Sequence, residues 1–282
     1  MVERRHWFTD LLPHIVLCLG VLVVAFPVWL AFVGSTWDAG TIANGKMPLY
    51  PGPYLFENYS RTILQGRSGT GEPVGMMMLN SLTMALAIAF GKIAISIFSA
   101  FAIVYFRFPF RMAAFWLIFI TLMLPVEVRI YPTYKVVADL HLLDTYAGLA
   151  IPLIASATAT LLFRQFFMTV PPELVEASKI DGAGPMKFFK DTVLPLSVTT
   201  MAALFVIQFI YGWNQYLWPL LITTRPDMQT IVLGIKKMIV TQDALTEWQL
   251  AMATAVLAML PPVLVVLVMQ KLFVRGLVET EK

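Results

Sequence analysis

Charged residues divide the chain into six long stretches that themselves carry almost no charge. The stretches run over 11–37, 73–106, 112–126, 145–163, 192–224 and 248–270, and Lys92 alone interrupts the second. A helix needs about 20 apolar residues to cross the hydrocarbon core of a bilayer. Because five of the six stretches reach or nearly reach that length, the sequence predicts an all-α, polytopic membrane protein with six transmembrane helices.

Three of the stretches depart from the length of a simple span. The third is short and must continue past Glu127 and Arg129 toward Tyr131 in order to cross the bilayer. The second and fifth are too long for one perpendicular helix and too short for two spans joined by a loop. Each of these two is therefore expected to tilt or to carry extra turns outside the lipid.

The composition agrees with a membrane protein. Hydrophobic residues make up 59% of the chain and charged residues 13%, whereas about 25% of an ordinary globular chain is charged. A soluble enzyme, a secreted disulfide scaffold and a disordered chain are thereby excluded. One cysteine permits no internal disulfide, and the three histidines lack the spacing of metal ligands. Basic residues are spread between the apolar stretches, so no nucleic-acid binding is expected.

The distribution of Lys and Arg predicts the orientation of the chain. One alternate set of connections, 1–10, 107–111, 164–191 and 271–282, holds 11 of the 20 basic residues in 55 positions, and the opposite set holds 8 in 80. Basic residues favour the cytoplasmic side, so both termini are expected there. The first apolar stretch is too long for a signal peptide, whose apolar region has about 7–15 residues, so an uncleaved first span is expected.

The chain is therefore expected to consist of five regions. These are a cytoplasmic N-terminus (1–10), a first transmembrane helix (11–33), a periplasmic loop (34–75), a transmembrane core that holds helices 2–6 and a cytoplasmic loop at 166–195 (76–270), and a cytoplasmic C-terminus (271–282). Gly and Pro are dense within 37–75, so this connection is expected to contain at most short helices.

The cytoplasmic loop at 166–195 has the features of two short helices. Pro172 suits a first helical turn, and Glu173 and Glu176 place negative charge where the helix dipole favours it. The Asp-Gly-Ala-Gly sequence at 181–184 is typical of a helix stop. A second helix is then expected over 185–193. The loop is either an ordinary solvated connection or an element that docks on a partner, and its composition does not distinguish the two.

The same loop contains a long motif. It consists of Glu176-Ala177-Ser178, two further residues, Asp181-Gly182-Ala183, then Phe188-Phe189 and Leu194-Pro195-Leu196, and 106 residues follow Glu176. This motif resembles the cytoplasmic loop of permease subunits of bacterial binding-protein-dependent ABC importers. Ser178 departs from the family pattern, which has a third alanine there, but a serine still fits a close-packed helix face.

The resemblance extends over essentially the whole chain. It includes Asn80-Ser81-Leu82 and the segments 101–109, 124–125 and 143–149, which are similar to the carbohydrate-uptake group of these importers. Three further segments, 122–129, 209–219 and 273–278, resemble more narrowly the second permease subunit of sn-glycerol-3-phosphate importers.

The resemblance implies a mechanism and a set of partners. In this family two permeases pair as a heterodimer, each inserts its cytoplasmic loop into one of two ATPase subunits, and a periplasmic binding protein delivers the substrate. The chain would then be no enzyme and bind no cofactor, because ATP and Mg²⁺ belong to the ATPase. It would move sn-glycerol-3-phosphate, or glycerophosphodiesters, through the bacterial inner membrane by alternating access. The residues implied to couple to the ATPase are Glu173, Glu176, Ala177, Ser178, Asp181, Gly182, Ala183 and Pro195.

Two basic residues in or beside the expected spans need an explanation. Lys92 has apolar residues for more than ten positions on either side, and a charge at the bilayer centre costs at least about 2.5 kcal/mol. Lys92 is interpreted either as a cation that attracts a phosphate, or as a lysine that is partnered between helices or reaches the membrane surface; the latter pair is favoured. Arg129 either binds the anionic substrate or forms a structural ion pair with another helix.

The fifth stretch carries a polar stripe at helical spacing. Gln208, Tyr211, Gly212 and Gln215 lie on one side, with Asn214 beside them, and in lipid such a stripe must face protein or water. Pathway lining is preferred for Asn214 and Gln215, with hydrogen bonding between helices as the alternative. The aromatic residues Trp213, Tyr216 and Trp218 are expected to anchor the helix at the membrane interface.

Other functions have less support in the sequence. Gly91-Lys92 lacks the first glycine and the Ser/Thr of a phosphate-binding loop, so the chain has no nucleotide site. A membrane enzyme would need clustered carboxylates, histidines or a Ser/His arrangement, which are absent from the sequence. A secondary transporter, and an importer of sugars or oligosaccharides, remain the alternatives. The secondary transporter is disfavoured because the sequence has no visible internal repeat and such a carrier needs no docking loop.

Overall fold

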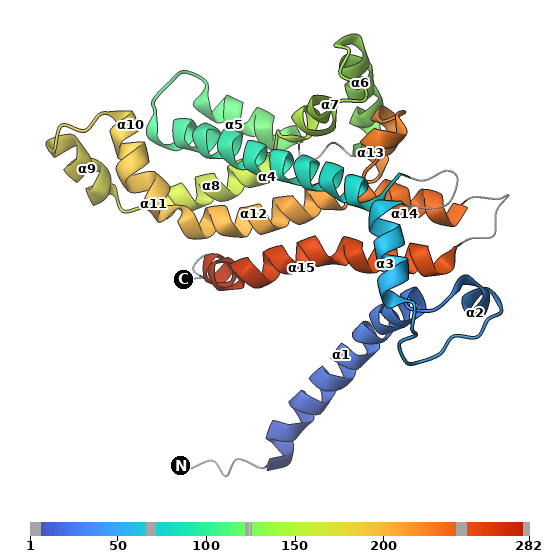
Figure 1. Cartoon of the computed structure of the whole chain (residues 1–282). Coiled ribbons are helices and arrows are strands. Elements are labelled where there is room, and N and C mark those ends of the chain that lie inside the picture. Colours follow the sequence, from blue (N-terminus) through green and yellow to red (C-terminus); the bar gives the residue numbers. More distant parts are fainter. Residues whose placement is uncertain (1–6, 66–71, 122–123, 125, 241–246, 279–282) are drawn as a thin grey trace. The chain divides into compact units, whose positions relative to one another are not determined.

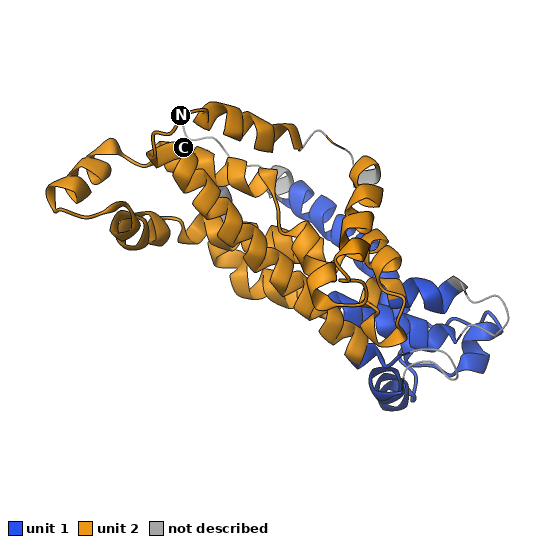
Figure 2. Ribbon diagram, turned by 90° about the horizontal axis from the view of Figure 1, so that it is seen from above, with its two compact units in different colours: residues 1–75, 234–259 blue, residues 76–233, 260–282 orange. Residues whose placement is uncertain are grey.

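The computed structural model describes residues 7–65, 72–121, 124, 126–240 and 247–278, and within these ranges the chain forms helices and turns without a strand. This confirms the predicted all-α class for the described residues. The expected cytoplasmic ends at 1–6 and 279–282, and part of the expected periplasmic loop at 66–71, lie outside them. The chain divides into two compact units, coloured separately in Figure 2: residues 1–75 with 234–259, and residues 76–233 with 260–282.

Unit 1 contains α1 (Trp7–Ser35), α2 (Ala39–Ala43), α3 (Leu55–Leu64), most of α14 (Ile231–Val240) and the first part of α15 (Trp248–Val278). Apolar side chains are exposed along most of α1. Its C-terminal end is held by α3, where the Asn58 amide donates to the backbone carbonyls of Ser35 and Trp37, each at 2.9 Å. The described part of the segment between α1 and α4 thus contains only short helices, as its turn residues predict.

Unit 2 is organised along α4 (Val74–Tyr105), which contributes to two buried apolar clusters. Near its C-terminal end, Phe101 packs with Phe163, Phe167 and other buried residues. Nearer its start, Ile88 belongs to a second cluster with Leu149 and Trp218. At a rise of 1.5 Å per residue, Ile88 and Phe101 lie roughly 20 Å apart along this helix. The two clusters therefore pack against different parts of α4.

The remaining helices of unit 2 are short or moderate in length (Figure 1). They are α5 (Arg111–Ile120), α6 (Val126–Asp139), α7 (Tyr146–Ala150), a 3-10 turn (Ile151–Leu153), α8 (Ala157–Thr169), α9 (Pro172–Ile180), α10 (Pro185–Phe188), a π-helical turn (Phe189–Val193), α11 (Leu194–Leu196), α12 (Val198–Trp213), α13 (Leu217–Ile222) and a 3-10 turn (Pro226–Met228). Helix α12 packs against α8, α5 packs against α8, and α13 packs against α6 and α7.

Three helical segments are long and apolar enough to cross a membrane by themselves: Leu11–Ser35, Val74–Tyr105 and Trp248–Leu272. Two further pairs of helices qualify only when each is taken together across a bend, of 48° between Tyr146–Leu153 and Ala157–Thr169 and of 70° between Pro185–Leu196 and Val198–Trp213. The described residues thus offer three to five candidate spans. The predicted count of six is not reached by single or bent helices.

The third apolar stretch does not form the continuous helix that was expected. Helix α5 ends at Ile120, and a separate helix, α6, begins at Val126 and continues through Arg129 and Tyr131. The sequence places Pro125 in this interval, and a proline supplies no N–H for the hydrogen bond that continues a helix. The side chain of Glu127 lies outside those described.

The fifth apolar stretch also contains a break. Helix α12 ends at Trp213, Asn214 is its C-terminal cap, and a new helix begins at Leu217. The predicted polar stripe is therefore wrong beyond Gly212, because Gln215 lies outside the helix. The assignment of Trp213 and Trp218 as interface anchors is also wrong, since both indole rings are buried in the protein. The Trp218 Nε1 donates to the carbonyl of Gly148 at 3.1 Å, which satisfies its polar atom inside the core.

Candidate functional site

The first helix and the glycine turn of the loop at 166–195 fold as the sequence predicts, whereas the second helix, expected over 185–193, continues through a π-helical turn into α11 and ends only at Leu196. Pro172 occupies the first turn of α9, with Glu173 beside it and Lys179 in the last turn, so both charges favour the helix dipole. The helix ends at Ile180, and the turn after it contains Gly182, whose φ of +70° is a conformation that glycine adopts without strain. The Ala183 N–H donates to the carbonyl of Ser178 at 2.9 Å and closes the turn. Pro185 then begins α10.

Helix α9 has no buried residue and lies at one end of unit 2, beyond α8 and α12 (Figure 1). Its apolar residue Ile180 is 86% exposed, and Leu174 and Met186 are also exposed. Among the eight residues expected to couple to an ATPase, Glu173, Glu176, Ala177, Asp181, Gly182 and Pro195 are exposed, and Ser178 and Ala183 are half-buried. A small helix thus presents acidic, small and apolar side chains together on an open surface.

The exposed helix α9 lies next to a cluster of aromatic rings, which we call the aromatic base and define as Phe101, Tyr105, Phe188 and Phe189. Directly after the turn, Phe188 and Phe189 are buried against α4: the Phe189 ring lies 4.9 Å from that of Phe101, and the Phe188 ring 5.2 Å from that of Tyr105. Val175 of α9 packs against the same cluster. Side chains on and directly after α9 thus contact residues of both α4 and α8. The burial of Phe188 and Phe189 was not predicted from the motif that contains them, although two adjacent phenylalanines in a loop outside the membrane indicate buried contacts.

Lys92 is partnered inside the protein. Its side chain is only 6% exposed. Its Nζ donates to Gln208 Oε1 at 2.9 Å and lies 3.7 Å from the centre of the Tyr211 ring. Of the interpretations kept open from the sequence, the partnered lysine between two helices is the one that the structure shows, with α12 as the partner of α4. The polar residues Gln208 and Tyr211 are accordingly explained by contact with Lys92.

The other residues expected along the pathway are more accessible. Arg129 is exposed on α6. Asn214 is exposed at the end of α12, and the side-chain amide of Gln215 donates back to the Tyr211 carbonyl at 3.2 Å. The structure thus brings Lys92, Gln208 and Tyr211 together in one contact. A role in lining the substrate pathway stays a prediction for all six residues considered: Lys92, Arg129, Gln208, Tyr211, Asn214 and Gln215.

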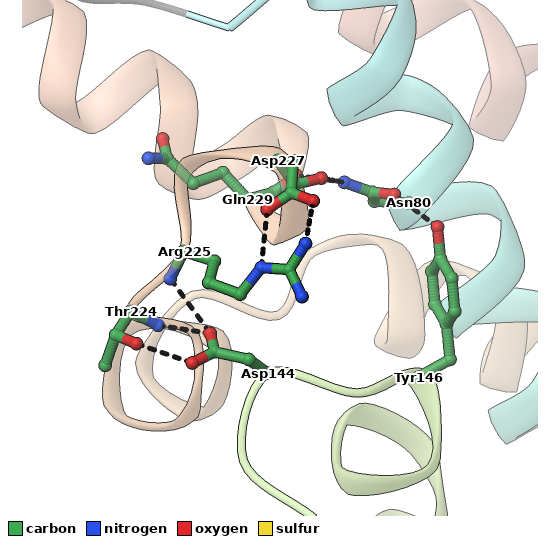
Figure 3. Close-up of polar contacts among 7 residues, drawn as sticks. All are labelled: Asn80, Asp144, Tyr146, Thr224, Arg225, Asp227 and Gln229. Carbon is green, nitrogen blue, oxygen red and sulfur yellow. Dashed lines mark hydrogen bonds and ion pairs between the residues drawn. The ribbon is translucent and has the colours of Figure 1, made fainter.

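A polar cluster near the start of α4 was not predicted as a unit (Figure 3). We call it the polar clasp and define it as Asn80, Asp144, Tyr146, Thr224, Arg225 and Asp227. The Asp144 carboxylate accepts hydrogen bonds from the backbone N–H groups of Thr224 (2.6 Å) and Arg225 (2.9 Å) and from the Thr224 hydroxyl. Partial burial of Asp144 opposes its charge, but these hydrogen bonds outweigh burial and lower the pKa of Asp144.

The clasp extends from Asp144 to the first turns of α4. The Asn80 amide donates to the backbone carbonyls of Asp227 (2.7 Å) and Gln229 (3.0 Å), and its oxygen accepts from the Tyr146 hydroxyl at 2.6 Å. The Arg225 guanidinium pairs with the Asp227 carboxylate. Three segments distant in sequence are therefore joined at one end of unit 2. Only the positive φ of Asp144 (53°) is a local feature, and no sequence pattern pairs it with a residue 80 positions away.

Residues 92–279 match the family described as binding-protein-dependent transport system inner membrane component. The chain belongs to this family. Its members are transport components rather than enzymes, in agreement with the absence of a nucleotide-binding motif from the sequence.

Curated relatives of this inner membrane component match over their whole length. The chain is 58% identical over 282 residues to the sn-glycerol-3-phosphate transport system permease protein UgpE of Yersinia pestis bv. Antiqua (strain Antiqua), with 100% of both chains covered. It is 57% identical, with the same coverage, to the UgpE proteins of Rhizobium meliloti (strain 1021) and Escherichia coli O157:H7. The predicted resemblance to permeases of sn-glycerol-3-phosphate transport is thereby confirmed.

A solved structure confirms the permease fold. It is the crystal structure of a bacterial ABC transporter involved in the import of the acidic polysaccharide alginate. The two chains superpose with a TM-score of 0.81 at 20% identity, over 96% of this chain and 98% of the other.

Proposed function

We propose that this chain is the membrane-spanning permease subunit of an ATP-driven importer of sn-glycerol-3-phosphate. The observation that carries the proposal is the identity of 56–58% over full length to curated permeases of sn-glycerol-3-phosphate transport. The shared fold supports an importer architecture but does not bear on the substrate, because the alginate transporter is only 20% identical.

In this proposal α9 docks on a separate ATPase subunit. The exposed Ile180 and Leu174 would supply apolar contacts, and Glu176 and Asp181 polar ones. Support comes from the aromatic base, since Phe188 and Phe189 connect α9 rigidly to α4 and α8. ATP and Mg²⁺ would bind to two copies of that ATPase, so this chain needs no cofactor of its own. A second permease subunit and a periplasmic binding protein complete the machine.

The proposed topology has six crossings in the bacterial inner membrane. They are α1, α4, the pair α5 and α6, the bent pair α7 and α8, the bent segment α10–α12, and α15. Residues 1–10, 166–195 and 271–282 would be cytoplasmic, and 34–75 periplasmic. A single cysteine placed at Ile180 in a Cys18→Ser chain should then react with an impermeant thiol reagent only from the cytoplasmic side, and one placed at Lys135 only from the periplasmic side.

The substrate would pass between the paired permeases by alternating access. Arg129 is the exposed cation among the proposed pathway residues, and a guanidinium can bind a phosphate through two parallel hydrogen bonds. Asn214 and Gln215 would add polar contacts at the break between α12 and α13. Lys92, Gln208 and Tyr211 satisfy one another and would support this surface from behind.

Uptake in a strain that lacks its own glycerol-3-phosphate permeases tests the proposal. The chain is expressed with its partner subunits, and uptake of labelled sn-glycerol-3-phosphate, a glycerophosphodiester and maltose is compared. We expect saturable uptake of the first that stops when ATP is depleted. Uptake of maltose alone would contradict the substrate, and uptake driven by an ion gradient without ATP would identify a secondary transporter instead.

A further inference from the structure

A group of basic and aromatic side chains surrounds the junction between α4 and α5. We call it the arginine–aromatic rim and define it as Phe106, Arg107, Phe108, Phe110, Arg111 and Arg164. The three phenylalanines are all exposed, and Phe110 is 84% exposed. None of the six residues belongs to the loop at 166–195 or to the polar clasp, although the Phe106 ring also contacts Phe101 at 5.7 Å. Apolar rings that crowd an exposed turn indicate a surface that something other than bulk water covers.

The backbone holds one of these rings outward at a cost. Phe110 has a φ of +61°, in the left-handed region that a bulky residue rarely adopts. It is the residue that precedes α5, and its carbonyl accepts the N–H of Ala114 at 2.9 Å, so its conformation is tied to the helix start. The turn therefore fixes the Phe110 ring on the outside of the protein instead of folding it into the adjacent aromatic cluster.

Two arginines of the rim belong to the helices next to this turn, one to α5 and one to α8. Arg111 begins α5, and Phe115 lies four residues later on the same helix face. The guanidinium of Arg164, from α8, lies over the Phe115 ring at 4.3 Å from its centre. The guanidinium of Arg164 thus lies on the face of α5 that begins with Arg111, and Arg107 is exposed in the preceding turn.

Among the described residues, these cations have no acidic partner. The sequence has no Asp or Glu between Glu72 and Glu127. Among the described residues, the ion pairs involve Arg61, Lys135 and Arg225, and no carboxylate lies within 4.0 Å of Arg107, Arg111 or Arg164. The rim therefore combines uncompensated positive charge with exposed apolar rings.

We propose that the arginine–aromatic rim binds the head groups of anionic phospholipids. The rim directly follows Tyr105, where a candidate span ends, so it lies at the depth of lipid phosphates if α4 crosses the membrane. Guanidinium groups bind phosphate oxygens, and the phenyl rings enter the adjoining apolar layer. Exposed Trp116 and Leu117 continue the apolar surface along α5. The proposal rests on the membrane embedding of the proposed function and is independent of its substrate.

The test measures which lipids remain bound to the assembled importer. The complex is purified in mild detergent from membranes that contain phosphatidylethanolamine and phosphatidylglycerol, and the retained lipids are quantified by mass spectrometry. We expect the wild-type complex to be enriched in phosphatidylglycerol relative to the membrane. Arg107→Gln/Arg111→Gln leaves the stacking of Arg164 on Phe115 intact and should lower that enrichment by about fivefold or more, since each basic residue at an anionic surface contributes about that factor.

Two further variants make the result specific. Lys46→Gln/Lys135→Gln removes two exposed charges elsewhere and should leave the enrichment unchanged. Arg107→Lys/Arg111→Lys keeps the charges and should retain most of the enrichment. If the glutamine pair does not assemble, Arg107→Gln alone is used, because Arg107 is exposed in the turn before α5.

Four outcomes would overturn the proposal. They are no enrichment in the wild type, no loss in Arg107→Gln/Arg111→Gln, an equal loss in Lys46→Gln/Lys135→Gln, and loss of the ATPase subunit with enrichment retained, which would make the rim a protein interface. The measurement needs neither substrate nor ATP. A failed uptake experiment therefore leaves it unaffected, and a negative lipid result leaves the proposed transport function intact.

Discussion

The ammonium group of Lys92 donates a hydrogen bond of 2.9 Å to the side-chain oxygen of Gln208, and both residues are buried between α4 and α12. The two are 116 positions apart in sequence. A single polar contact thus joins the longest helix of unit 2 to the helix whose C-terminal end carries Asn214.

Replacing Gln208 alone should therefore destabilise the protein more than replacing both Lys92 and Gln208. Gln208→Leu leaves a buried ammonium without its acceptor, which costs about 1–3 kcal/mol, whereas Lys92→Met/Gln208→Leu replaces the pair by apolar groups. Thermal unfolding of the purified complex should show a lower Tm for the single variant and a partial recovery for the double one. Equal Tm values for the two variants would mean that the hydrogen bond contributes nothing to stability.

Gly182 should be required for coupling. A valine at its φ of +70° is strained by about 1–2 kcal/mol, so Gly182→Val should shift the turn and displace α9. We expect normal membrane insertion, with ATP hydrolysis no longer linked to uptake in proteoliposomes. Gly184→Ala is the matched control, because Gly184 has an ordinary φ of −71° and open space around it. Normal uptake by Gly182→Val would refute the role assigned to this turn.

Substitutions in the aromatic base and in the exposed helix α9 should have different effects, the first on stability and the second on binding of the ATPase. Phe189→Ala removes a buried ring and should lower the stability of the base by about 3–5 kcal/mol, which is measured as a drop in Tm. Ile180→Ala removes an exposed side chain, so the Tm should be unchanged while ATPase subunits are recovered less efficiently by pull-down. A pull-down unaffected by Ile180→Ala would exclude Ile180 from the docking surface.

The helix α9 and the turn after it were predicted well, because their start and end depend on residues close together in the sequence. Pro172 at the start of α9 and Gly182 at its stop act within a few residues, and the structure has both where the sequence placed them. The all-α class was predictable from the length of the apolar stretches, because the thickness of the bilayer sets the length of a helix that crosses it.

Features that depend on tertiary contact were not predictable. Trp218 resembles an interface anchor in the sequence, yet it is buried because the Gly148 carbonyl accepts its N–H from 70 positions away. The break between Trp213 and Leu217 was not predictable in this way, because the three residues between them include neither proline nor glycine. The partner of Asp144 likewise lies in another helix connection, where only the folded chain brings it near.

The polar clasp should make stability depend on pH in acid. The folded-state pKa of Asp144 lies below its unfolded value of 3.8, so the stabilisation is complete above that value and is lost as the pH falls through the folded-state pKa. The Tm of the wild type should therefore decrease more steeply below about pH 4 than that of Asp144→Asn. Asp139→Asn, which removes an exposed carboxylate paired with Lys135, is the control. Parallel Tm curves for wild type and Asp144→Asn would show that the clasp is unaffected by this charge.

Arg129 should set the affinity for a phosphate-bearing substrate. It is exposed on α6, and removing its charge should weaken a charge-assisted contact with the substrate by about 1.5–3 kcal/mol, or roughly 10- to 150-fold in affinity. Arg129→Gln should raise the apparent KM for sn-glycerol-3-phosphate uptake, while substrate binding by the periplasmic protein stays the same. Lys135→Gln, on the same helix and also exposed, should leave KM unchanged. If both variants shift KM equally, the effect comes from the general charge of α6 and Arg129 has no direct contact with the phosphate.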